Sequence, residues 1–233
     1  MPQFLILRLD GPMQAWGGHS YEDFRPSHIF PTRSGLLGLL GACLGLDRQD
    51  RKGLARLAES VVFAVRTDRD VLRPGREEPA NKRALKLPDF HRVLDARKVD
   101  GSVNKNPVVS RREYLFDAAF TVAVGVRSEA FFSLEQIAEA VQKPRYTPFL
   151  GRRSCPLARP LYERIVEAQD IKAALAQIAP TEGVIYGEGD AMQNTRPMQI
   201  RDVPLHCKQR QFGTRWIYVH ADEGEQPNVS ESL

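Results

Sequence analysis

The segment PTRSGLLGLLGACLGL (residues 31–46) predicts an α-helix that some other part of the molecule must approach closely. On a helical wheel, Gly35, Gly38, Gly41 and Gly45 fall within about a third of the circumference, and leucines fill the opposite side. Each glycine costs roughly 1 kcal/mol of helix propensity relative to alanine, so close packing must offset that loss. The sequence leaves two explanations open: backbone packing against the glycine face, or a ligand bound there.

The start of this helix has the features of an anion site. Thr32 or Ser34 is the expected N-cap, and the first backbone N–H groups, from Ser34 to Leu36, would be free to bind one phosphate of a polymer, with Arg33 beside them. Ordinary helix capping explains the same residues equally well.

The chain around this helix alternates strands and helices. PQFLILRLD (2–10) predicts a central strand buried on both faces, and residues 11–31 a long loop. A second helix is expected over 50–60 and a strand over 60–68. Residues 70–84, rich in Pro, Gly and charge, predict a flexible loop.

A long basic β-hairpin is expected next. LPDFHRVLDARK (87–98) and NPVVSRREYLF (106–116) flank the turn dipeptide Asp100-Gly101, which is typical of hairpins. Cationic residues interrupt both arms, so the hairpin cannot bury a face of its own and is expected to project. They are Arg92, Arg97, Lys98, Lys105, Arg111 and Arg112.

The remaining chain completes a mixed architecture. A strand is predicted over 117–127 and a helix over 133–142; a further helix is predicted over 168–178, a short strand over 183–188 and a last strand over 210–221. This order predicts an α+β, ferredoxin-like (RRM-like) sandwich with the hairpin, about residues 85–115, protruding from it. We expect this domain over 1–150, a smaller C-terminal region over 151–220, and an acidic flexible tail over 221–233.

Composition narrows the function. The 233 residues carry a formal net charge of +4, and 42% of them are hydrophobic, which supports a sizeable core. The longest apolar run is too short to cross a membrane, and the N-terminus lacks the basic start of a signal peptide. Three dispersed cysteines and five scattered histidines predict neither disulfides nor a metal site, and no phosphate-binding loop predicts a nucleotide cofactor. We therefore expect a cytoplasmic protein without metal or cofactor.

The positive charge is concentrated in two islands. Residues 66–112 carry 13 Lys and Arg against 7 Asp and Glu, and residues 143–164 carry 6 against 1, which suggests a polyanionic partner. Within the second island, Arg145 and Tyr146 stand in a proline-framed stretch and Arg152 and Arg153 follow Gly151. Arginine for phosphate and tyrosine for base stacking suit single-stranded RNA. Solvated loops pinned by carboxylates are the alternative.

Catalytic residues are not evident from the spacing. His28, His91, Tyr114 and Lys143 could act as general acid and base in a metal-independent ribonuclease, but no motif brings them together.

Four blocks of sequence closely resemble family five of the CRISPR-associated proteins, in its type I-E branch. They are LILRLDGPMQAWG (5–17), RPSHIFPTRSGLLGLLGACLGL (25–46), SRREYLFDAAFTVAV (110–124) and KPRYTPFLGRRSCPL (143–157). The second and fourth blocks are very specific, whereas residues 70–84 and those beyond 165 match poorly.

The resemblance implies a function as well as a fold. It implies a ferredoxin-like domain with a hairpin "thumb", in a subunit of the Cascade surveillance complex that caps the 5′ handle of crRNA. The implied partners are the crRNA 5′ handle, the Cascade backbone subunit, the Cascade large subunit and, through the complex, target DNA. Carried over to this chain, the RNA-binding candidates are Arg25, Arg33, Ser34, Arg92, Arg97, Arg111, Arg112, Arg145, Tyr146, Arg152 and Arg153.

The same resemblance implies a non-catalytic subunit, because a separate subunit processes the RNA in the type I-E branch. Relatives in the type I-C branch do cleave guide precursors. The alternative function is therefore a metal-independent endoribonuclease that processes CRISPR repeat RNA.

Overall fold

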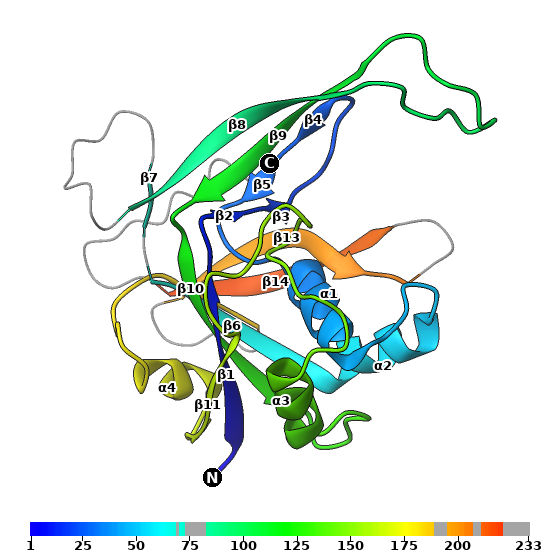
Figure 1. Ribbon diagram of the computed structural model, residues 1–233. Coiled ribbons are helices and arrows are strands. Elements are labelled where there is room, and N and C mark those ends of the chain that lie inside the picture. The colour runs from blue at the N-terminus through cyan, green and yellow to red at the C-terminus, as the bar shows by residue number, and fades with distance from the viewer. Residues whose placement is uncertain (69, 73–82, 189–194, 207–210, 221–233) are drawn as a thin grey trace.

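The computed structural model describes the chain except for residues 69, 73–82, 189–194, 207–210 and 221–233 (Figure 1). The helices are α1 (Arg33–Leu44), α2 (Arg51–Ser60), α3 (Leu134–Gln142) and α4 (Ile171–Ala176). The fold is mixed α and β, with mostly antiparallel sheets, as the sequence predicts at that level. No described helix is both long enough and apolar enough to span a bilayer.

The main sheet has seven antiparallel strands in the order β11-β1-β10-β6-β12-β14-β13. Their bounds are β1 (Gln3–Asp10), β6 (Val61–Thr67), β10 (Ala119–Val126), β11 (Tyr162–Glu167), β12 (Ile185–Gly187), β13 (Arg196–Pro204) and β14 (Phe212–His220). The prediction of a central first strand is confirmed, because β1 lies between β10 and β11 and is buried on both faces.

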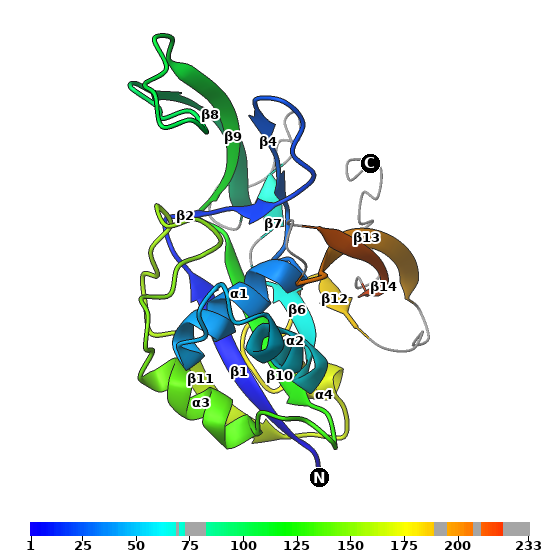
Figure 2. The same cartoon turned by 90° about the vertical axis from the view of Figure 1, so that its right-hand side faces the viewer.

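Helices cover both faces of the strands around β1 (Figures 1 and 2). Leu5, Leu7 and Leu9 belong to the large core that also takes in α1 and α3. Phe4 and Ile6, which alternate with those leucines, pack on the opposite face with α4. This period-two division of side chains is why β1 reads as a continuous apolar run.

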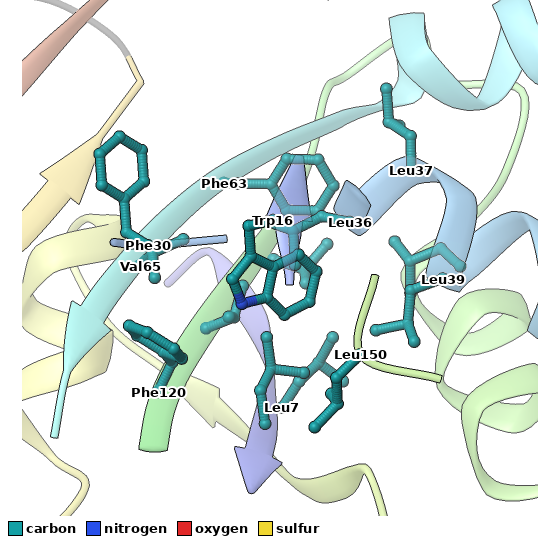
Figure 3. Close-up of a cluster of buried hydrophobic side chains, with 14 of the residues drawn as sticks. Leu7, Trp16, Phe30, Leu36, Leu37, Leu39, Phe63, Val65, Phe120 and Leu150 are labelled. Carbon is teal, nitrogen blue, oxygen red and sulfur yellow. The ribbon is translucent and has the colours of Figure 1, made fainter. Parts of the chain in front are cut away.

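The glycine face of α1 is packed by side chains. A Cβ on Gly35 would lie 2.7 Å from Cε3 of Trp16, and one on Gly41 would lie 3.3 Å from Leu54. Trp16 is fully buried among leucines of α1 and the sheet, and its indole N–H donates to Gln14 at 3.1 Å (Figure 3). At Gly35 and Gly41 the neighbours are therefore side chains rather than backbone, whereas Gly38 is exposed and a Cβ there would meet nothing within 4 Å.

The predicted N-cap of α1 is confirmed at Thr32, and the structure shows further caps at the end of α1 and the start of α3. Thr32 accepts a hydrogen bond from the N–H of Gly35, and α1 ends before Gly45, which adopts the left-handed conformation with φ of +75°. Ser133 and Gln136 form a reciprocal capping box at the start of α3.

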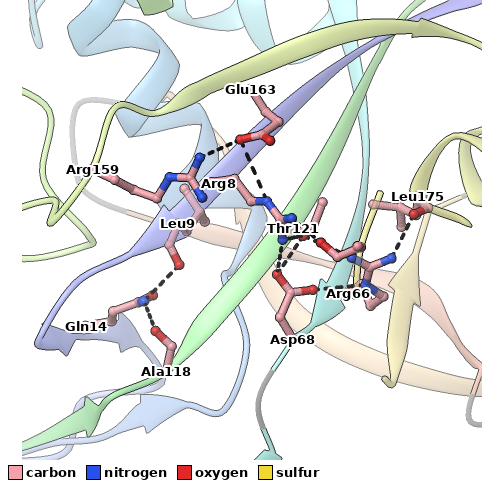
Figure 4. A network of polar contacts seen from close by, with 11 residues as sticks. Arg8, Leu9, Gln14, Arg66, Asp68, Ala118, Thr121, Arg159, Glu163 and Leu175 are labelled. Carbon is pink, nitrogen blue, oxygen red and sulfur yellow. Dashed lines mark hydrogen bonds and ion pairs between the residues drawn. The ribbon is translucent and has the colours of Figure 1, made fainter. Parts of the chain in front are cut away.

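A buried polar network holds the middle of the sheet to α4 (Figure 4). Asp68 accepts from Arg8 at 2.7 Å and from Arg66 at 3.0 Å, and the Thr121 hydroxyl donates to it at 2.6 Å. Arg66, which has no exposed surface, also donates to the carbonyl of Leu175 in α4. Each charged group is paired, as burial in a core requires.

The predicted hairpin is confirmed and projects from the body (Figure 1). Its arms are β8 (Arg83–Val93) and β9 (Val108–Phe116), paired from Leu85↔Phe116 to Val93↔Val108. In the connecting segment, Gly101 has φ of +82°. The hairpin belongs to a second sheet with β2 (Met13–Gln14), β4 (Phe24–Arg25) and β7 (Asp70–Leu72).

Several elements differ from the sequence-based expectation. The predicted loop over 11–31 contains β2, β4 and the paired strands β3 (Trp16–Gly17) and β5 (Ser27–His28). β11 and β13 are strands that the sequence did not predict. Most of the predicted flexible loop over 70–84 and the predicted tail over 221–233 lie outside the described residues.

Candidate nucleic-acid interface

The base of the hairpin assembles arginines from distant parts of the sequence. β4 pairs in parallel with β9, so that Arg25 lies beside Arg112 and Phe24 beside Arg111. Directly paired residues in a sheet share a face, so Arg25 and Arg112 project to one side and Phe24 and Arg111 to the other. We call these sides the arginine face and the phenylalanine face.

The phenylalanine face combines exposed aromatic rings with exposed cations. Phe90 pairs with Arg111 across the hairpin and is 62% exposed, and Phe24 is 37% exposed. Arg92, two residues beyond Phe90, projects from the same face and is exposed. Arg111 contacts Asp23 at 3.4 Å, although 63% of its side chain remains accessible. The bases of a single-stranded nucleic acid stack on exposed aromatic rings, and its phosphates bind exposed guanidinium groups.

The arginine face is more extensively bonded to the protein. Arg25 donates to the carbonyls of Glu22 and Phe24, and Nε of Arg112 donates to the Ser110 hydroxyl at 3.0 Å. Both side chains are half-buried. These bonds fix the direction of the guanidinium groups before any ligand binds.

Arg152 connects three segments at this site. Its guanidinium donates to the carbonyl of Glu113 in β9 and to that of Arg25 in β4, each at 3.1 Å, and lies 4.6 Å from the centre of the Tyr114 ring. The preceding Gly151 has φ of +83°, and a Cβ there would lie 1.8 Å from a backbone oxygen of Ala15. Position 151 therefore has no room for a side chain, and Arg152 has a structural role. Its neighbour Arg153 is exposed.

The arginine face also brings together residues with acid–base potential. Nε2 of His91 lies 3.3 Å from the Tyr114 hydroxyl and 2.9 Å from the Asp89 carboxylate. The sequence spacing gave no reason to place His91 beside Tyr114, but the hairpin register does, because the two residues lie on one face of neighbouring strands.

Glu113 joins the two arms of the hairpin by an ion pair and joins the hairpin to β5 by a hydrogen bond. Glu113 accepts from Lys86 at 2.9 Å and from the backbone N–H of Ser27 at 2.9 Å. His28, next in the chain, has its pKa lowered, chiefly by burial; Lys86 also lowers it, whereas Asp202 and Glu113 oppose the shift. The neutral imidazole is therefore favoured here.

Two further arginine candidates lie away from the base. Arg92 is near the end of the paired arms. Arg97 is in the connecting segment, where its backbone forms an isolated antiparallel β-bridge with Val103. Both side chains are exposed. Exposed apolar residues accompany them: Leu94, Val99 and Val103. These apolar residues and the two phenylalanines were not predicted from the sequence, although the alternation Phe90-x-Arg92 was a usable signal.

The anion site expected at the start of α1 is occupied by the protein itself, which corrects the prediction for Arg33. The backbone N–H of Arg33 donates to Asp202 at 2.6 Å. Its buried guanidinium pairs with Glu188 and donates to the carbonyls of Ala58 and Val61. Burial and these partners leave Arg33 no access to a phosphate. Ser34 is half-buried beside it, 3.4 Å from the Thr32 hydroxyl.

Arg215 completes this internal network. It pairs with Asp202 at 2.6 Å and with Glu188 at 2.8 Å. Burial alone would lower the pKa of Arg215, but the hydrogen bonds to Asp202 and the charge of Glu188 raise it overall. The network therefore joins α1 to β13 and β14 as a stable structural unit.

Arg145 and Tyr146 lie at the other end of α1. Their backbone N–H groups donate to the carbonyls of Cys43 and Ala42 in its last turn. Because twelve helical residues span about 18 Å, the pair is well separated from Ser34. Both side chains are exposed. The structure thus places the candidates in three locations: the hairpin with Arg152 and Arg153, the start of α1, and the end of α1.

The described part of the chain holds few residues of the metal-binding and thiol type close to one another. There, no three His, Cys, Asp or Glu side chains gather as a potential metal site. Cys43 and Cys155 are buried free thiols, and burial raises the pKa of Cys43 to about 11.

Comparison with known proteins gives consistent matches. Residues 4–218 match the family model described as CRISPR-associated protein (Cas_Cas5). A relative from Escherichia coli (strain K12), "CRISPR system Cascade subunit CasD", is 46% identical over 220 residues, which cover 94% of this chain and 96% of the relative.

Two solved structures have the same overall arrangement. One chain, from "CRISPR RNA-guided surveillance complex", is 29% identical with a TM-score of 0.72, and the match covers 93% of this chain and 88% of that one. Another, "Crystal structure of Cas protein", is 25% identical with a TM-score of 0.59, and the match covers 92% and 94%.

Proposed function

The chain belongs to the CRISPR-associated Cas5 family, and from that membership we propose that it is the RNA-binding subunit of a type I-E Cascade complex that caps the 5′ handle of crRNA. The observation that carries this proposal is the 46% identity to a Cascade subunit across nearly the full length of both chains. The partners would be the Cascade backbone and large subunits, and target DNA through the complex. Its place would be the cytoplasm.

The hairpin is the proposed contact region for the RNA. Its exposed rings and cations supply both stacking and phosphate contacts without a metal. We assign the contacts to Arg25, Arg92, Arg97, Arg111, Arg112 and Arg153, and a supporting role to Arg152, which bonds to β4 and β9. Ser34, Arg145 and Tyr146 lie at the ends of α1, away from the hairpin, and are not assigned to this contact. Arg33 is left out because its guanidinium and backbone N–H are already bonded within the fold.

We further propose that the body is ferredoxin-like. The adjacent strands β11-β1-β10-β6, with helices in the connections after β1 and β10, support this assignment. The fourth strand, β11, lies beyond residue 150, so the unit would extend to Glu167. The remaining strands β12, β14 and β13 would form the smaller C-terminal region, followed by residues 221–233.

A direct test is binding of handle RNA by the full chain at several salt concentrations. The variant Arg92→Ala/Arg97→Ala/Arg111→Ala removes three exposed hairpin cations, and each lost phosphate contact should flatten the log–log salt dependence by about 0.7. Arg159→Ala is the control, because this exposed arginine pairs with Glu163 beside the main sheet. Unchanged RNA affinity in the triple variant would contradict the proposed site.

The second candidate function, an endoribonuclease, is favoured by one contact, that of His91 with Tyr114. Under the non-catalytic proposal, the purified chain should give no discrete product from repeat RNA in EDTA. A product that His91→Ala abolishes would establish the enzymatic function instead.

A further inference from the structure

A second basic surface lies on α2 and at the end of α1, away from the hairpin. α1 ends at Leu44, and a short turn leads into α2. Beside this turn, Arg145 lies against Gly45, where a Cβ would be 2.6 Å from Cγ of the arginine. We call this surface the α2 strip; its six cations are all exposed: Arg48, Arg51, Lys52, Arg56, Lys143 and Arg145.

The cations of the α2 strip are not neutralised by nearby carboxylates. Among the described residues, no ion pair involves any of the six. Three acids lie on the same stretch: Asp47 and Asp50 accept from the backbone N–H groups of Gln49 at 2.7 Å and Gly53 at 2.9 Å, and Glu59 is exposed near the end of α2. Because the strip has six cations against these three carboxylates, its net charge is positive.

Exposed aromatic rings flank both ends of α2. Tyr146, 49% exposed, is held at the end of α1. Phe131, 59% exposed, follows β10, and its backbone N–H donates to Ser60, the last residue of α2. Arg56 lies 4.3 Å from the centre of the Phe131 ring. Arginines interleaved with aromatic rings are more typical of a surface that binds nucleic acid than of one that binds an acidic protein.

The α2 strip and the hairpin are too far apart for both to bind the same short end of a nucleic-acid strand. The start of α1 packs on Trp16, next to the strands at the hairpin base, and α1 then runs about 18 Å to the strip. Figure 2 shows the hairpin rising from the top of the body, with α2 at mid-height and α3 at the lower end. The two surfaces would therefore engage different segments of nucleic acid.

We propose that the α2 strip binds the sugar–phosphate backbone of duplex DNA, independently of the RNA at the hairpin. A helix is convex and has no groove to enclose a single strand, whereas a row of cations on a helix can follow one backbone of a duplex. The contacts are to phosphate, so binding has no sequence preference. This inference goes beyond the proposed function and does not depend on it.

The test uses the full chain, a 20-base-pair DNA duplex of arbitrary sequence, and single-stranded handle RNA. The strip variant is Arg48→Ala/Arg51→Ala/Lys52→Ala. Its matched control, Arg159→Ala/Arg164→Ala/Arg196→Ala, removes three exposed arginines from β11, β13 and the segment before β11. Thermal unfolding of both variants verifies that they fold.

We expect the strip variant to weaken duplex binding at least tenfold and to reduce the log–log salt slope by about 2.7, three contacts at about 0.9 each. Handle RNA binding should change less than twofold, and the control variant should retain duplex binding. If the strip and control variants lose duplex affinity equally, the net charge of the protein explains the effect, and the proposal is overturned.

Other outcomes separate this inference from the proposed function. A strip variant that loses duplex and RNA binding together would overturn the idea of two surfaces. Unchanged duplex binding would also overturn it and would leave an acidic protein partner as the occupant. Hairpin variants that fail to affect RNA binding would contradict the proposed function alone.

Discussion

Arginines in the main sheet and arginines in the hairpin have opposite surroundings. In the sheet, Arg66 is fully buried and pairs with Asp68, which also accepts from Arg8. In the hairpin, Arg92 and Arg97 are exposed, and Arg111 makes one long contact with Asp23. The same side chain thus closes the core in one region and remains available to a polyanion in the other.

The difference shows that a count of arginines does not locate a binding surface. Residues 66–112 form one basic island in the sequence, but the fold buries its first arginine and exposes Arg92, Arg97 and Arg111 of the hairpin. What distinguishes the two kinds is whether a carboxylate within the fold already satisfies the guanidinium. Substitutions can test this distinction directly.

The largest effect is expected at Arg66. Arg66→Met leaves Asp68 with one of its two arginine partners and should lower the free energy of unfolding by about 3–5 kcal/mol. Arg97→Met, the matched exposed substitution, should change it by less than about 0.5 kcal/mol. Urea denaturation of both variants measures the difference, and similar values for the two would remove the distinction between sheet and hairpin.

Arg33 should behave as a residue of the sheet. Arg33→Met leaves Glu188 with Arg215 as its one remaining arginine partner among those described. We expect the free energy of unfolding to fall by about 3 kcal/mol. The folded variant should bind handle RNA with unchanged affinity, because the side chain is buried. If the variant is as stable as the original chain but binds handle RNA more weakly in a titration, Arg33 takes part in RNA binding and the prediction is wrong.

Arg152 and Arg153 offer a comparison between adjacent residues. Arg152→Ala removes two hydrogen bonds to carbonyls and the contact with Tyr114, which should cost about 1–2 kcal/mol of stability. Arg153→Ala should cost less than about 0.5 kcal/mol but flatten the salt dependence of RNA binding by about 0.7. The reverse pattern would exchange their roles.

The smallest effect is a pH dependence at the junction of the two regions. The pKa of His28 is lowered from 6.5, so the unfolded chain binds the proton more readily than the folded one. The free energy of unfolding should therefore decrease as the pH falls below 6.5. His28→Gln should flatten this dependence in urea titrations between pH 7 and 5; an unaltered slope would show that other groups cause it.

Much of the fold was predictable because its signals are local. The turn at Asp100-Gly101 predicted the hairpin, and the helix predicted over 133–142 matches α3. β13 was missed because its inward positions, Met198, Ile200 and Asp202, end in a carboxylate that breaks the apolar alternation. That carboxylate has a partner 169 residues away, which no local pattern reveals.

The candidate site was predictable in part for the same reason. Exposure of Arg92 and Arg97 follows from a hairpin too basic to be buried. The burial of Arg33 depends on Glu188, and the role of Arg152 depends on carbonyls of β4 and β9, so neither could be read from neighbouring residues. Long-range pairing decides which arginines remain free.

The bond from Asp202 to the first turn of α1 constrains the order in which this protein matures. During translation, α1 leaves the ribosome more than 150 residues before the carboxylate that completes its N-terminal end. The nascent hairpin is therefore synthesised, with its cations accessible, on a body that still lacks β13 and β14. The closure of the start of α1 by Asp202 is therefore a late event in the synthesis of the chain.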